Sequence, residues 1–504
     1  MLFNSIEYLF FLPIVFLIYW AIGYARINDS LKLRLQNAFV VIASYVFYGW
    51  WDWRFLILIA FTSFCSWGSG LLIGKELKNE GVNELKKKFW LIANIVLNLG
   101  ILAIFKYYDF FTSEFCQLFG ISSDGLLIKI ILPVGISFYT FHALSYSIDV
   151  YRKKIEPTKD IIAFFAFISF FPQLVAGPIE RATNLLPQFL QNRKFCYEQG
   201  VDGMRQILWG LFKKIVIADN CATYVDQVWS TYGTQSGSTL LLAAVLFTFQ
   251  IYGDFSGYSD IAIGTAKLFG IKLMRNFNNP YFSRDIAEFW RRWHISLTTW
   301  FRDYVYIPLG GSRPTIDNRW IGDRWTENSK KFIIVRNTFV IFLLSGIWHG
   351  ANWTFLAWGA YHAVLFLPLI LLGQNRKFTG QVAEGRWLPT WREALQMLLT
   401  FGLVVIGWII FRAETIGQAW EIMRGICNTS LLSVPWLMTR DFYMPLFGCL
   451  LLMLIVEWVN RSQQHAFARL TKYRWLNWLI YYAIIYLMYQ YQPMEEVQFI
   501  YFQF

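Results

Sequence analysis

The chain has 504 residues, of which 56 % are hydrophobic and 15 % are charged. Soluble domains carry about 25 % charged residues, so the composition excludes an ordinary soluble protein and indicates an all-α, polytopic membrane protein. The net charge of +12 does not require a nucleic-acid partner, because the basic residues fall in short loops between apolar runs, as they do in membrane proteins.

The apolar runs are numerous and lie close together. They fall near residues 5–22, 36–50, 54–74, 90–107, 127–149, 160–176, 237–253, 255–271, 333–348, 352–373, 394–412, 442–459 and 474–490. A span needs about 20 mostly apolar residues. Because several runs are short or interrupted, we expect about eleven transmembrane helices plus re-entrant and interfacial helices. No soluble domain of ordinary size separates them, so residues 1–504 are expected to form one integrated domain.

The first loops predict the orientation in the membrane. Segments 23–35 and 75–89 and the triplet 152–154 are basic, whereas segment 108–126 carries acids and no Lys or Arg. The positive-inside rule then places the basic loops in the cytoplasm and the N-terminus outside. We expect a multi-pass protein of the plasma or inner membrane.

The central third departs from a simple bundle. Residues 203–220 are short, amphipathic and basic, which is typical of an interfacial or re-entrant helix. In residues 274–313, arginines such as Arg291 alternate with tryptophans such as Trp293, again as in an interfacial helix. That interpretation leaves His294 unexplained, so we treat it as a candidate functional residue.

Two other polar stretches interrupt apolar sequence. Residues 252–260 (YGDFSGYSD) contain Asp254 and Tyr258, and their glycines predict an unwound stretch that lines a cavity with its carboxylates inward. Residues 345–352 (SGIWHGAN) contain Trp348, His349 and Asn352. Polar groups at membrane depth face the protein interior or a water-filled cavity and are commonly functional. In each stretch, a polar turn or a structural hydrogen bond remains the alternative.

Motifs of soluble enzymes are absent from the sequence. It contains no GxSxG, HExxH or GxGxxG motif, and its six cysteines show no CxxC spacing. We therefore predict no metal site, no disulfide framework and no bound cofactor.

Five short motifs stand out along the chain, at residues 131–141 (ILPVGISFYTF), 172–178 (PQLVAGP), 252–260 (YGDFSGYSD), 289–297 (FWRRWHISL) and 346–353 (GIWHGANW). In these motifs the chain resembles the membrane-bound O-acyltransferase family. The resemblance extends over essentially the whole chain and is strongest to the bacterial branch that acetylates exported polysaccharides such as alginate. The D-alanine transfer proteins of teichoic acid are similar at a greater distance.

This resemblance implies a site and a reaction. Its essential histidine corresponds to His349 and its second polar position to His294, and the helices would enclose a central funnel or tunnel. The donor would be a cytoplasmic thioester, either acetyl-CoA or an acylated carrier, and the acceptor a hydroxyl of an exported polysaccharide. A neutral imidazole can take the hydroxyl proton as that oxygen attacks the thioester. An extracytoplasmic acyltransferase partner would complete the transfer.

The aromatic segment 495–504 resembles a motif with an acyl-accepting tyrosine in bacterial members of the family. We hypothesise that Tyr501 is a covalent relay activated by His349, although an aromatic tail at the membrane interface is the alternative. Two competing functions stay open. A secondary transporter or flippase would also place charges in broken helices, and an acyltransferase acting on lipid or protein would share the histidine.

Overall fold

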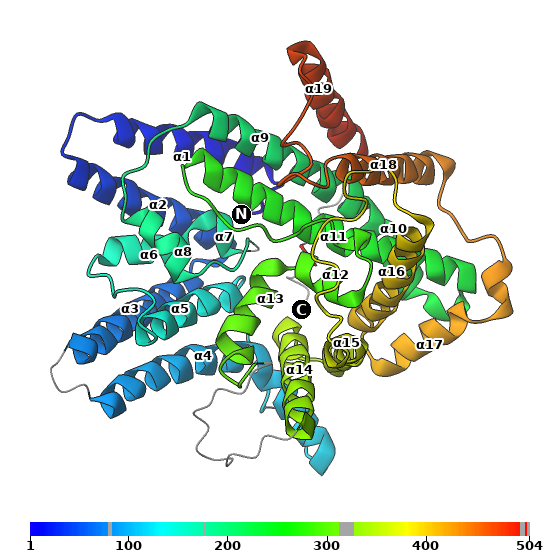
Figure 1. The fold of residues 1–504 in the computed structure, drawn as a ribbon, viewed down its shortest axis with the longest axis horizontal. Coiled ribbons are helices and arrows are strands. Elements are labelled where there is room, and N and C mark those ends of the chain that lie inside the picture. Colours follow the sequence, from blue (N-terminus) through cyan, green and yellow to red (C-terminus); the bar gives the residue numbers. More distant parts are fainter. Residues whose placement is uncertain (79–82, 124, 176, 312–326, 494–498, 501–504) are drawn as a thin grey trace. The chain divides into compact units, whose positions relative to one another are not determined.

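The computed structural model describes residues 1–78, 83–123, 125–175, 177–311, 327–493 and 499–500. In this part of the chain every regular element is a helix and there is no β-strand (Figure 1), so the all-α prediction is confirmed. Eight of the described helices are long and apolar enough to cross a membrane. The protein is therefore a multi-pass membrane protein, and the count of about eleven spans stays a prediction.

The chain divides into two compact units. The first consists of Met1–Ile207 and Ile261–Met274, and the second of Leu208–Asp260 and Arg275–Phe504. Each is described below by itself, and the interpretation of residues 1–504 as one integrated domain stays a prediction.

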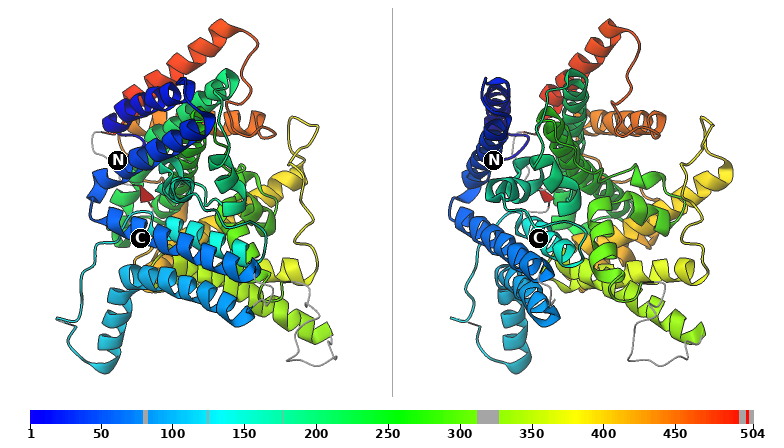
Figure 2. Two further views of the ribbon diagram at one scale, coloured as in Figure 1. Left: turned by 90° about the vertical axis from the view of Figure 1, so that its left-hand side faces the viewer. Right: turned by 60° about the vertical axis from the view of Figure 1, so that its left-hand side comes forward.

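The first unit carries the N-terminal helices. They are α1 (Ile6–Tyr24), α2 (Asp29–Asp52), α3 (Phe55–Lys78), α4 (Glu84–Phe119), α5 (Ile136–Tyr151), α6 (Ile161–Ser169), α7 (Phe171–Leu174), α8 (Ala182–Phe189) and most of α9 (Tyr197–Phe212). Figures 1 and 2 both show α3 and α4 lying side by side. Buried amides and hydroxyls link the helices here, because Asn94 of α4 bonds Ser147 of α5 at 2.7 Å and Ser66 of α3 at 3.1 Å. Hydrogen bonds of this kind hold helices together where no water competes.

Two apolar runs of this unit form shorter helices than expected. The run at 127–149 becomes helical at Ile136, after Gly135, which has a left-handed backbone (φ +74°). A Cβ at Gly135 would lie 2.3 Å from the Leu174 carbonyl oxygen, so the close approach requires glycine. The run at 160–176 breaks at Phe170, between α6 and α7.

The second unit holds the remaining helices. They are η1 (Lys213–Ala218), α10 (Asp219–Ser230), η2 (Tyr232–Thr234), most of α11 (Gly237–Leu268), η3 (Pro280–Phe282), α12 (Ile286–Arg292), α13 (Ile295–Phe301), η4 (Arg302–Tyr306), α14 (Glu327–His349), α15 (Trp353–Leu371), α16 (Trp391–Arg412), α17 (Ile416–Ile426), η5 (Thr429–Leu432), α18 (Arg440–Val459) and α19 (Arg474–Tyr491). Figure 1 shows α14 beside α15.

The stretch at 252–260 corrects one prediction. We expected its glycines to unwind the chain, but α11 runs unbroken from Gly237 to Leu268. Gly257 instead permits close packing, because a Cβ there would lie 2.7 Å from the carbonyl oxygen of Gly210 on α9. Small residues let helix backbones approach closely, which explains these glycines without any unwinding.

The amphipathic segment 203–220 also differs from the expected short helix. It belongs to a continuous helical stretch from Tyr197 to Ser230, in which the six residues of η1 form a π-helix. Lys213 and Lys214 of η1 are buried, with 3 % and 0 % of their surface exposed. They contact carboxylates of neighbouring helices, and a sequence pattern at the period of a surface helix does not reveal such pairing.

Candidate active site

A break between two short helices positions the first candidate histidine. Asp285 caps α12, since its carboxylate accepts from the Glu288 N–H at 2.6 Å. The helix ends at Arg292, Trp293 is extended, and His294 has a left-handed backbone (φ +43°) before α13 begins. A left-handed conformation is uncommon for a residue other than glycine, and such strain is concentrated at functional sites.

The preceding loop satisfies the backbone groups that this break exposes. The N–H of Asn278 donates to the Arg292 carbonyl oxygen at 2.9 Å, and the N–H of Ile295 donates to the Asn276 carbonyl oxygen at 2.9 Å. Buried backbone groups must find such partners. The loop at 276–280 thus supports the helix break.

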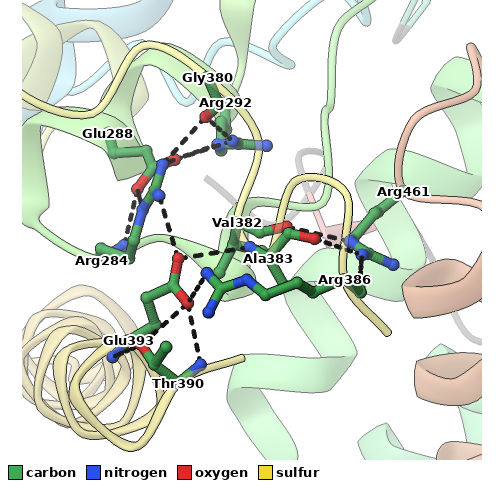
Figure 3. Close-up of polar contacts among 10 residues, drawn as sticks. All are labelled: Arg284, Glu288, Arg292, Gly380, Val382, Ala383, Arg386, Thr390, Glu393 and Arg461. Atoms are coloured by element: carbon green, nitrogen blue, oxygen red, sulfur yellow. Dashed lines mark hydrogen bonds and ion pairs between the residues drawn. The ribbon is translucent and has the colours of Figure 1, made fainter. Parts of the chain in front are cut away.

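A cluster of arginine and glutamate side chains also holds α12 in place (Figure 3). The buried Glu288 carboxylate accepts from Arg284 at 3.0 Å and from Arg292 at 2.8 Å. Both arginines also reach the carbonyl oxygen of Gly380. Glu393 of α16 extends the cluster, 3.5 Å from Arg284. Paired and hydrogen-bonded in this way, buried charges are tolerated and hold the end of α12 in place.

The hydrogen bonds of His294 define its tautomer. Its Nδ1 lies 3.0 Å from Oδ1 of Asn276, and that oxygen also accepts from the Ser296 hydroxyl at 2.9 Å. The Asn276 amide nitrogen donates to Ser259 at 3.0 Å, which identifies Oδ1 as the acceptor. We therefore assign the ring proton to Nδ1, which leaves Nε2 as an acceptor. Nε2 has no hydrogen-bond partner among the described residues.

Burial keeps this imidazole neutral. The side chain of His294 is 1 % exposed, and desolvation lowers the pKa of its ring to about 3. At neutral pH its Nε2 thus carries a lone pair that can accept a proton or a hydrogen bond.

The second candidate histidine ends α14. His349 is 6 % exposed, and aromatic rings surround it. Its ring lies 4.9 Å from that of Trp348, 5.1 Å from Trp358 and 5.1 Å from Phe411. Trp348 also lies 5.9 Å from the His294 ring. Trp348 is therefore a neighbour of both candidate histidines.

Both histidines line one cavity of about 420 Å³. Its wall is mostly apolar and aromatic, and hydroxyls of Thr338 and Ser345 from α14 add polar groups. Volumes of 300–1,000 Å³ with a few convergent polar groups are typical of small-molecule sites.

Three arginines, Arg291, Arg302 and Arg376, also line this cavity, together with Asn375. The Arg291 guanidinium is fixed by the carbonyl oxygens of Asn375 and Phe378. Several guanidinium groups at one cavity favour an anionic ligand, since they can donate several hydrogen bonds to phosphate or carboxylate.

The structure brings some of the expected site residues to the cavity and leaves others elsewhere. His294, His349, Trp293 and Arg291 line it. Asn352 instead caps α15, because its Oδ1 accepts from the Thr354 N–H at 3.0 Å. Asp254 and Tyr258 lie on α11 and do not line the cavity. Tyr501 lies outside the described residues.

Sequence reasoning missed the partners of His294. Neither Asn276 nor Ser296 was among the candidate site residues. A buried histidine needs a hydrogen-bond partner, but an asparagine eighteen residues earlier gives no periodic signal. His362 lies on α15, one helix after His349, and is not part of the cavity lining.

Fold and site together define a multi-pass, all-helical membrane protein with two buried histidines at one cavity, which is the arrangement of a membrane-embedded enzyme. The sequence model of the membrane-bound O-acyltransferase family matches residues 136–410. The chain belongs to this family and is an O-acyltransferase.

Named relatives agree with this assignment. The chain is 40 % identical to the probable alginate O-acetylase AlgI of Pseudomonas aeruginosa over 84 % of its own length and 74 % of that protein. It is 32 % identical to the peptidoglycan O-acetyltransferase of Helicobacter pylori over 93 % of its length and 90 % of the relative. Similarity to the teichoic acid D-alanyltransferase of Bacillus subtilis is lower, at 29 % over 56 % of the chain and 69 % of that protein.

Proposed function

We propose that this enzyme moves an acetyl group from a cytoplasmic thioester to hydroxyls of an exported or cell-surface polysaccharide. The observation that carries the proposal is the cavity lined by both His294 and His349. Relatives named for acetylating alginate and peptidoglycan support a glycan acceptor. Membership of an O-acyltransferase family favours this function over a transporter or flippase, and a lipid or protein acceptor is the remaining alternative.

In this proposal His349 is the general base. A hydroxyl oxygen attacks the thioester carbonyl carbon, and its proton passes to the imidazole of His349. The new C–O bond forms as the C–S bond breaks, and the proton then moves to the departing sulfur, which leaves as a thiol. The neutral Nε2 of His294 accepts a hydrogen bond in the same cavity and helps to orient the reacting hydroxyl.

The attacking hydroxyl in the first step is the phenol of Tyr501. This makes a tyrosyl ester, from which an acceptor hydroxyl takes the acetyl group while the phenol regains a proton. An extracytoplasmic acyltransferase partner delivers the group to the polysaccharide. We also propose, from the basic loops described above, that the N-terminus is extracytoplasmic. The protein would reside in the plasma or inner membrane.

The arginines at the cavity support a donor that carries phosphate. Acetyl-CoA and an acylated carrier both present the thioester on a phosphate-bearing arm, and Arg291, Arg302 and Arg376 would bind that charge. A mostly apolar wall excludes water around the thioester and so protects it from hydrolysis.

The first test is His349→Ala, with glycan acetylation measured in cells and protein abundance measured in their membranes. We expect loss of the O-acetyl ester at unchanged abundance, because proton removal by a positioned base contributes about 100- to 10,000-fold. The matched control is His362→Gln, which removes a buried histidine beside the same Trp358 but outside the cavity lining. Retained ester in His349→Ala would make that histidine structural.

The second test is Tyr501→Phe, which removes a single oxygen. A relay requires the phenol, so transfer should be lost without loss of protein. Tyr489→Phe is the control, because that tyrosine is 74 % exposed. Unchanged transfer in Tyr501→Phe would refute the relay and leave direct attack by the acceptor hydroxyl.

A further inference from the structure

Two consecutive buried lysines mark an unusual part of the second unit. Lys213 Nζ lies 2.7 Å from Asp260 and 2.8 Å from the Ser256 hydroxyl, and Lys214 Nζ lies 2.7 Å from Asp219 Oδ1. Both lysines belong to the π-helix η1. π-helical turns are rare and occur frequently at functional sites.

Asp254 of α11 connects this charge cluster to a distant segment of the chain. Its Oδ1 lies 2.8 Å from Lys214 Nζ, and its Oδ2 accepts the backbone N–H of Ile500 at 2.7 Å. The carboxylate is 3 % exposed, so each of its oxygens needs the partner that it has. A hydrogen bond to a buried charge is stronger than one between neutral groups.

The residue before Ile500 packs on the same turn of α11. Phe499 is 0 % exposed, and its ring lies 4.2 Å from that of Tyr258 and 6.2 Å from that of Phe255. Phe499 and Ile500 are therefore held twice, by a backbone hydrogen bond to Asp254 and by aromatic packing. We call these two residues the anchored segment.

The same turn of α11 touches the candidate site. The ring of Phe255 meets that of His294 edge-on, with centroids 4.6 Å apart. One turn of α11 thus contacts the anchored segment through Asp254 and Tyr258 and contacts His294 through Phe255. The cavity histidine and the anchored segment share a neighbour.

A purely structural contact would not need buried ions. Desolvation of Asp254, Asp219 and Lys214 is costly, and apolar residues of similar volume commonly stabilise a fold as well or better. The Asp254 carboxylate, held by Lys214, can accept a hydrogen bond from the Ile500 N–H in a fixed position, and an apolar side chain cannot.

We propose that Asp254, held by Lys214, is a positioning residue that fixes Phe499 and Ile500 against the turn of α11 that also contacts His294, and that acyl transfer through the following residue, Tyr501, depends on this anchor. This inference rests on the proposed function, in which Tyr501 receives the acyl group. It gives Asp254 and Lys214 a role in catalysis without direct contact with the substrate.

The anchor can be tested without acyl chemistry, by hydrogen–deuterium exchange at the Ile500 amide in the full-length protein in detergent. Asp254→Asn keeps the size of the side chain but removes its charge. Exchange should accelerate on the order of 10- to 100-fold, the factor expected for loss of a charge-assisted hydrogen bond. The matched control is Asp219→Asn, which removes the other acid on Lys214 and leaves the bond to Ile500. Its exchange should match that of the wild type.

A second variant covers the case in which Asp254→Asn fails to fold. Phe499→Ala removes the packing against Tyr258 without changing a charge, and it should also accelerate exchange at Ile500. Unchanged exchange at Ile500 in Asp254→Asn, or in Phe499→Ala where Asp254→Asn does not fold, would overturn the anchor. That conclusion would hold whether or not Tyr501 is acylated.

Turnover then separates the anchor from the relay. Asp254→Asn should lower kcat and leave the KM for the thioester donor unchanged, because donor binding does not use the anchored segment. Suppose that Tyr501→Phe inactivates the protein, but Asp254→Asn shows faster exchange at Ile500 with unchanged kcat. That result would overturn the positioning role of Asp254 and leave the relay intact. If Asp254→Asn shows faster exchange and a lower kcat while Tyr501→Phe remains active, the anchor would be supported and the relay refuted.

Discussion

The contact between His294 and Asn276 makes a testable prediction about pH. Replacing Asn276 by Asp puts a carboxylate in place of the amide that accepts the Nδ1 proton at 3.0 Å. A negative charge at this distance stabilises the protonated ring and raises its pKa. In the wild type, burial holds that pKa near 3, so the ring stays neutral throughout the physiological range.

The size of the shift follows from the distance. Two unit charges 3 Å apart interact by about 5.5 kcal/mol at an effective dielectric constant of 20. Since one pKa unit corresponds to about 1.4 kcal/mol, the pKa of His294 should rise by up to about four units and approach neutrality. Below that pKa the ring carries a proton on Nε2 and can no longer accept one.

The assay is acyl transfer from a thioester donor in purified membranes between pH 5 and pH 8. Wild-type activity should show no acidic limb from His294, whereas Asn276→Asp should lose activity as the pH falls through about 7. Asn278→Asp is the control, because it adds the same charge two residues away without contacting the ring. A pH profile of Asn276→Asp that matches the wild-type profile, at normal abundance, would refute a role for neutral His294.

Two further predictions concern stability. Gly257→Val should destabilise the protein by about 1–3 kcal/mol, because its side chain would meet the Gly210 carbonyl at the α9–α11 contact; a melting temperature equal to that of the wild type in detergent would contradict this packing. Glu180 is buried in the first unit, and desolvation raises its pKa from 4.5 to about 7. A raised carboxyl pKa gives stability that is full below about pH 4.5 and declines by about 3 kcal/mol as the pH rises past 7. Melting between pH 5 and pH 8 should therefore show a decline that Glu180→Gln removes, and an equal decline in both proteins would assign it to other groups.

Much of the architecture could be predicted from the sequence, because lipid imposes a simple rule on it. Long apolar runs such as those of α1, α3 and α16 begin and end within a few residues of the predicted positions. In a membrane a helix satisfies all its own backbone groups, so length and hydropathy are sufficient to find it. The family and its two histidine motifs followed from short stretches of residues.

What could not be predicted depends on contacts between distant residues. Glycines at 253 and 257 have the same local signature whether they unwind a helix or permit close packing, and the facing carbonyls of Lys213 and Gly210 decide between the two. The pairing of Lys214 with Asp254, and of His294 with Asn276, likewise joins residues with no periodic relation in the sequence.

The left-handed backbone of His294 has a consequence for how substitutions there are interpreted. Glycine adopts this conformation at no steric cost, and asparagine and aspartate adopt it more readily than other side chains, whereas β-branched residues are strained. A library of all substitutions at His294 could therefore be assayed for two independent properties of each variant. Abundance in the membrane would select for tolerance of the backbone, and transfer activity would select for the imidazole. We expect variants with Gly or Asn to be abundant but inactive, so that they test the chemistry of the ring in a folded protein.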